Sequence, residues 1–79
     1  MSDKMDLSTD LRRVSLWIAR DSDELANNIL KRDLDRYKDL KVKIGGVSIG
    51  KWLEMIIDRV GGREQAAERA LTAAVILSF

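Results

Sequence analysis

Apolar residues recur at spacings of three and four along most of this 79-residue chain, and this spacing constrains the fold more than any other feature. Positions three or four residues apart share one face of an α-helix, so the pattern predicts amphipathic helices. Capping residues and glycines interrupt the pattern near residues 20–22, 41–48 and 61–62. The sequence therefore predicts four helices, over residues 9–20, 22–40, 49–60 and 63–79.

The predicted fold class is all-α, a small four-helix bundle-like single domain spanning residues 1–79. Short connections between consecutive helices favour antiparallel neighbours, which is why a bundle is expected. Residues 1–6 are polar and are expected to fray. At residues 41–47 we expect an extended linker, because a lone strand has no partner. Pairing of Val42 to Ile44 with another strand would contradict the all-helical prediction.

The predicted core consists of apolar residues that repeat on the helix faces. Its members are Leu11, Val14, Ile18, Leu25, Ile29, Leu53, Ile56, Val60, Ala70 and Leu77. A chain of this length buries roughly 60–65% of its unfolded surface, so its stability is small. The 22 Leu, Ile and Val residues suffice for one compact core or for a core shared between two copies.

The composition excludes most of the familiar catalytic and metal-binding chemistry. The chain has no cysteine and no histidine, so disulfides, cysteine-based zinc sites and triads built on Ser-His or Cys-His are impossible within it. We therefore predict that the chain is not an enzyme and has no catalytic residue, cofactor or metal. No apolar run approaches the ~18 residues of a membrane span, and no signal peptide is recognised. The expected location is cytoplasmic, without a membrane partner.

One segment fits the G-x-x-x-x-G-K pattern of phosphate-binding loops, residues 45–51. Trp52 occupies the position that needs Ser or Thr for Mg²⁺, and the chain is too short for the parallel sheet that supports such a loop. We interpret the segment as a helix–helix connection in which Ser48 caps the third helix. A weak anion contact at the N–H groups of that helix stays open.

The end of the last predicted helix is apolar around its whole circumference. Val75, Ile76 and Phe79 point away from the stripe of small residues that includes Ala66 and Ala70, so one intramolecular contact cannot cover them all. We predict that these three side chains bind a partner. The alternatives are that this helix lies at the centre of the bundle, or that the chain is cut from a longer protein.

A second candidate partner-binding surface lies on the first predicted helix. Arg13, Trp17 and Arg20 occupy positions i, i+4 and i+7, so their side chains share one flank and a guanidinium group can stack over the indole. Such a patch suits phosphate or a partner protein. The alternative is a tryptophan at the edge of the core with two solvated arginines.

Asp33 falls among apolar residues on the helical wheel, close to Ile29, Tyr37 and Leu40. A buried carboxylate is costly unless it is paired. A hydrogen bond from a tryptophan indole or a backbone N–H would satisfy it. We favour the alternative that a break or curve in the second helix turns Asp33 outward.

These features predict a small helical protein–protein interaction or regulatory module without catalytic activity, which self-associates as a homodimer. The alternative is a DNA-binding regulator. Residues 31–43 carry six basic and three acidic side chains, a local net charge of +3, which is modest for a nucleic-acid-binding domain. In this alternative the contacts to nucleic acid come from four lysines, Lys38, Lys41, Lys43 and Lys51.

The second half of the chain resembles a ribbon-helix-helix module, a DNA-binding family. From Val42 it reads strand-like residues, a helix, Gly-Gly and a second helix, and residues 63–71 are similar to the start of that family's second helix. The resemblance covers about half of the chain and implies a ribbon that carries Lys41 and Lys43. A helix-turn-helix variant, with the third or fourth helix as the reader, stays an equal alternative.

Overall fold

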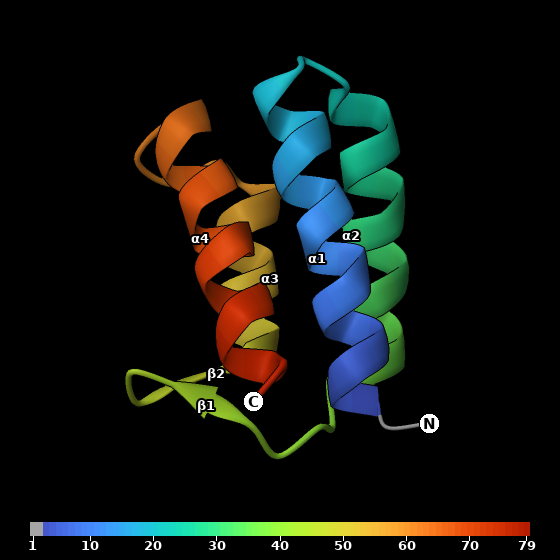
Figure 1. The fold of residues 1–79 in the computed structure, drawn as a ribbon, viewed down its shortest axis with the longest axis vertical. Coiled ribbons are helices and arrows are strands. Elements are labelled where there is room, and N and C mark those ends of the chain that lie inside the picture. Colours follow the sequence, from blue (N-terminus) through green and yellow to red (C-terminus); the bar gives the residue numbers. More distant parts are fainter. Residues whose placement is uncertain (1–2) are drawn as a thin grey trace.

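A computed structural model describes residues 3–79 and confirms the all-α fold, with four helices around one core (Figure 1). Each helix packs against two others, so that α1 contacts α2 and α4 while α3 contacts α2 and α4. No helix in the described part of the chain has both the length and the apolar character to cross a membrane. The helices are α1 (Asp3–Ala19), α2 (Asp23–Tyr37), α3 (Ile49–Ile57) and α4 (Arg63–Leu77).

The first helix begins earlier than its predicted start at residue 9. Asp3 and Asp6 lie in the first turn of α1, where the positive end of the helix dipole favours acidic side chains. Leu7 is buried and extends the apolar stripe by one turn. The predicted fraying is therefore wrong for residues 3–6, and residues 1–2 lie outside the described part.

A two-stranded hairpin replaces the predicted extended linker. Strand β1 (Lys43–Ile44) pairs antiparallel with β2 (Val47–Ser48). The partner strand comes from the same segment because both turn glycines, Gly45 and Gly46, have positive φ angles of 59° and 82°. Such angles are typical of the two-residue turns that match the twist of a hairpin. The linker prediction is therefore wrong, and so is the expectation of an entirely helical chain, whereas the all-α fold class is confirmed.

The hairpin is anchored to α3 by two side-chain hydrogen bonds. The indole N–H of Trp52 donates to the carbonyl oxygen of Ile44 at 2.9 Å. The hydroxyl of Ser48 accepts from the backbone N–H of Lys51 at 3.3 Å and caps α3, as predicted. The residues that fit the phosphate-binding pattern therefore form a hairpin turn followed by a capped helix start.

Helices α1 and α4 pack through small residues. Ala66, Ala70, Ala73 and Ala74 of α4 are buried. Two serines of α1 donate hydrogen bonds to α4 carbonyl oxygens, Ser8 to Ala74 at 2.5 Å and Ser15 to Ala67 at 2.9 Å. The donors and the acceptors are each seven residues apart, in opposite directions along the chain. The two helices therefore run antiparallel in one fixed register.

Seven of the ten predicted core residues are buried, and three are not. Ile29 is only partly buried, and two residues are exposed: Leu25 at 53% and Val60 at 44%. Leu25 lies outside the face that α2 buries, which carries Ala26 and Leu30. Val60 lies outside α3, which ends before its predicted end at residue 60. The predicted residues that are buried are Leu11, Val14, Ile18, Leu53, Ile56, Ala70 and Leu77.

An ion-pair network holds the two helix–helix connections at one end of the bundle. Arg63 donates to both carboxylate oxygens of Asp23, at 2.8 and 2.9 Å, and to the carbonyl oxygen of Ile18 at 2.8 Å. Arg59 donates to the same carboxylate at 3.3 Å. The hydrogen bonds from Arg63 lower the pKa of Asp23 from 3.8 to about 2. The stabilisation from this pairing is present above pH 3.8 and is lost as the pH falls through 2.

Leu53→Ala should lower the free energy of unfolding by about 2–5 kcal/mol, because Leu53 is fully buried in the core and a large-to-small change leaves a cavity. Leu25→Ala is the matched control, since the same change at an exposed site should cost less than about 0.5 kcal/mol. Urea unfolding followed by circular dichroism measures both. A loss below about 0.5 kcal/mol for Leu53→Ala would place that side chain on the surface.

Candidate functional site

Four exposed apolar side chains lie in the C-terminal half of α4 and just beyond its end, and we call them the apolar α4 face: Leu71, Val75, Ile76 and Phe79. All four are exposed, Phe79 at 91%. Leu71 and Val75 lie four residues apart on one face of the helix, and Phe79 follows at the same spacing, two residues after α4 ends at Leu77. Ile76 lies beside Val75. The predicted exposure of Val75, Ile76 and Phe79 is therefore seen, and α4 is not enclosed by the other helices.

The outer side of α4 changes character along its length. Its N-terminal half exposes Glu64, Gln65 and Glu68, whereas residues 71–79 contain no charged side chain. The opposite side is buried against α1 through the alanines and Leu77. Because the buried side takes only small residues and one leucine, the larger apolar residues of this helix end lie in solvent.

The second predicted surface is only partly exposed. Arg13 and Arg20 are exposed, but Trp17 is partly buried and packs against the core. Within residues 3–79 a cation–π contact joins Arg36 to Tyr37, with the guanidinium carbon 5.3 Å from the ring centroid, and none involves Trp17. The arrangement matches the alternative, a tryptophan at the edge of the core beside two solvated arginines.

The candidate nucleic-acid contacts are all exposed and lie in and beside the hairpin: Lys38, Lys41, Lys43 and Lys51. Two of them lie near acidic side chains, Lys38 at 3.7 Å from Asp35 and Lys51 at 4.0 Å from Glu54. The resemblance to ribbon-helix-helix proteins implied a ribbon that carries Lys41 and Lys43. In the structure Lys43 lies in β1, whose partner strand belongs to the same chain, and Lys41 precedes that strand.

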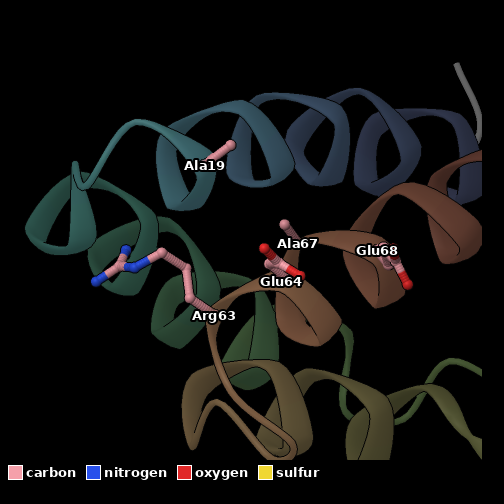
Figure 2. Close-up of a pocket in the computed structure, with 5 residues that line it drawn as sticks. All are labelled: Ala19, Arg63, Glu64, Ala67 and Glu68. Carbon is pink, nitrogen blue, oxygen red and sulfur yellow. The ribbon is translucent and has the colours of Figure 1, made fainter.

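A hollow of about 410 Å³ lies on the surface between α1 and the start of α4 (Figure 2). Ala19 and Ala67 contribute its small apolar side chains, and Glu64 and Glu68 its carboxylates. Arg63, also in its wall, is committed to the ion pairs at the helix connections. No group of three metal-ligating side chains occurs within residues 3–79. The sequence gives no signal for this hollow, which arises where two alanines from distant segments meet.

Sequence reasoning also missed a cluster between α1 and α2. Asp33, expected to turn outward, is fully buried, so that prediction is wrong. Arg32 lies 2.9 Å from Oδ2 of Asp10 on α1 and 3.4 Å from Oδ1 of Asp33. Helix α2 continues unbroken past Asp33 to Tyr37, so the side chain stays on the buried face. The sequence does not predict this cluster, because the position of Asp10 relative to Arg32 depends on how α1 packs against α2.

Comparison with protein-family models, curated proteins and solved structures gives no match to this chain. Function is therefore inferred from the residues and contacts described above. Of the two surfaces predicted to bind a protein partner, the apolar α4 face is the one whose side chains are all exposed.

Proposed function

We propose that this chain is a helical protein–protein interaction module, without catalytic activity, that self-associates as a homodimer through the apolar α4 face. The observation that supports the proposal is the exposure of four apolar side chains at the C-terminal end of α4, Leu71, Val75, Ile76 and Phe79. Burial of apolar surface favours association by about 25 cal/mol per Å². Contiguous exposed apolar patches are typical of interaction sites.

A second copy suits this face because pairing it with itself buries no charge. Residues 71–79 contain no ionisable side chain, whereas Glu64 and Glu68 lie on the other half of the helix. In a two-fold symmetric pair the same patch lies on both sides of the interface. If two α4 helices cross antiparallel near Val75, each Leu71 faces the Phe79 end of the other helix. The acidic halves then lie at opposite ends, away from each other.

The net charge of the chain also permits self-association. A formal charge of +1 gives little repulsion between two copies. Specific dimers bury about 800 Å² per partner, so the four side chains of the apolar α4 face would form the centre of the contact. Polar residues that surround the patch would supply its rim.

Ile76→Lys should convert the dimer to a monomer, because it places a charge within the apolar α4 face. Leu25→Lys is the matched control, since it adds the same charge at an exposed leucine on α2. Sedimentation velocity should give twice the chain mass of 8.9 kDa for the wild type and the control, and 8.9 kDa for Ile76→Lys. All three should keep the same helical circular dichroism spectrum.

Point substitution is a sharper test than removal of residues 76–79, because Leu77 within that segment is buried and its loss would damage the core. A wild-type chain that stays monomeric up to millimolar concentration would contradict the homodimer. A dimer that survives both Ile76→Lys and Phe79→Lys would place the interface elsewhere.

The second proposed function is DNA binding by the hairpin end of the bundle. Its support is the exposure of four lysines in and beside one hairpin, Lys38, Lys41, Lys43 and Lys51. Phosphate contacts from lysine give affinity that falls steeply with salt. The acidic neighbours of Lys38 and Lys51 reduce the local positive charge, which is why self-association is the first proposal. For either function the proposed compartment is the cytoplasm.

A mobility-shift assay with duplex DNA separates the two functions. If the hairpin binds DNA, the shift should weaken with rising salt, and the double variant Lys41→Gln/Lys43→Gln should bind more weakly at every salt concentration. Arg13→Gln/Arg20→Gln is the control, because it removes two exposed positive charges from α1 instead. No shift at low salt, or equal weakening by both double variants, would rule out the hairpin as the binding site.

A further inference from the structure

Two carboxyl groups lie close together between α1 and α2, and one of them is fully buried. The side chain of Asp33 has 0% exposure, and that of Asp10 has 17%. Arg32 bridges them, close to Asp10 at 2.9 Å but farther from Asp33 at 3.4 Å. The second oxygen of Asp33, Oδ2, has no hydrogen-bond partner, and one turn along α2 the buried hydroxyl of Tyr37 also has none.

A proton resolves the electrostatic conflict in this cluster. An ionised Asp33 would keep a buried negative charge whose Oδ1 has only two long contacts to Arg32, at 3.4 and 3.5 Å, which is unfavourable. A protonated Asp33 becomes a hydrogen-bond donor, and the carboxylate of Asp10 lies within its hydrogen-bonding reach. The single positive charge of Arg32 is then balanced by the single negative charge of Asp10.

We propose that Asp33 and Asp10 form a proton-binding site that joins α1 to α2 and that releases its proton as the pH rises. The proposal concerns the seam between α1 and α2, and it is independent of the apolar α4 face.

The charged groups around the site act in opposing directions. Burial raises the pKa of Asp33 most strongly, and Asp10 raises it further, whereas Arg32 lowers it. The net effect is a pKa of about 7 against an ordinary value of 3.8. Asp6 and Arg36 act on the neighbouring Tyr37, whose pKa is raised chiefly by its own burial. Burial together with a second carboxylate is the recognised cause of such strongly raised carboxyl pKa values.

The sign of the pH dependence follows from proton binding. Between pH 3.8 and 7 the folded chain holds a proton on Asp33 that the unfolded chain has released. Stability therefore falls as the pH rises through this window and levels off above it. Asp23 acts in the opposite direction below pH 3.8. The two groups together place the maximum of stability on the acid side of neutrality, and ionisation of Asp33 at higher pH weakens the α1–α2 seam.

Carbon-13 NMR of the side-chain carboxyl groups in the wild-type chain tests the site directly. The carboxyl resonance of Asp33 should titrate with a midpoint near 7, about three pH units above an ordinary aspartate. The chain contains no histidine, the side chain that usually titrates in this range, so no histidine obscures the transition. A midpoint below 5, or a resonance that stays ionised from pH 5 to 8, would overturn the proposal.

Stability measurements on matched variants give the second readout. In urea unfolding between pH 5 and 8, the wild-type midpoint should fall with rising pH. Asp33→Asn, which keeps the shape and removes the titration, should give a nearly constant midpoint that exceeds the wild-type value at pH 8. Asp35→Asn, the same change at an exposed site two residues away, should keep the wild-type slope.

The Asp10→Asn variant tests whether Asp10 contributes to the raised pKa of Asp33 or whether burial alone accounts for it. Removing the neighbouring carboxylate should shift the Asp33 titration toward lower pH, because the repulsion disappears and Arg32 has one acceptor fewer. An unchanged midpoint in Asp10→Asn would show that Asp33 binds the proton without Asp10, which contradicts the shared site. An equal pH slope in the wild type and Asp33→Asn would contradict the site altogether. If Asp33→Asn fails to fold, the wild-type titration still decides.

Discussion

The close approach of α1 and α4 is the contact on which the rest of this structure depends. Alanines on α4 remove the side-chain bulk that would keep the two helices apart, and Ser8 and Ser15 then reach the carbonyl oxygens of Ala74 and Ala67. A serine hydroxyl buried without a partner would be costly, so these hydrogen bonds also penalise any shift of register. One antiparallel pair thereby fixes the frame onto which α2 and α3 pack.

The same contact explains where the unusual surfaces lie. Because α4 presents its small residues to α1, its large apolar residues from Leu71 to Phe79 are left on the outer side. On the far flank of α1, Asp10 faces α2 and meets Asp33 and Arg32. The proposed association surface and the proposed proton-binding site therefore lie on different sides of the bundle, and each can be altered without touching the other.

The spacing of apolar residues predicted the helices well. It failed where the structure depends on contacts between residues far apart in the sequence. The spacing of Leu11, Val14 and Ile18 was enough to place the core face of α1. The residues before Gly45 do not by themselves indicate a hairpin, because the strand finds its partner only when Gly45 and Gly46 turn the chain back onto β2. Leu25 was misassigned because helical spacing alone does not say which flank of an apolar stripe a neighbouring helix will cover.

The candidate site was predicted only in part. The surplus of apolar residues at the end of α4 was visible in the sequence, as was the misplaced charge of Asp33. The exposure of the former depends on how α4 packs. The burial of the latter depends on how α2 packs against α1, where Asp10 lies more than twenty residues away along the chain. Neither the exposure of these α4 residues nor the burial of Asp33 can be predicted from the residues that neighbour them in the sequence. Charged residues that break a helical pattern are therefore informative about position only when their neighbours in space are known.

Urea unfolding of Ala70→Leu tests the central claim most directly, because Ala70 is fully buried on the side of α4 that carries the small residues. A leucine there should force the helices apart and lower the free energy of unfolding by about 1–3 kcal/mol or more. Glu68→Leu, on the exposed side of the same helix, should change it by less than about 0.5 kcal/mol. An Ala70→Leu chain as stable as the wild type would contradict the account, since α1 and α4 would then have room to spare.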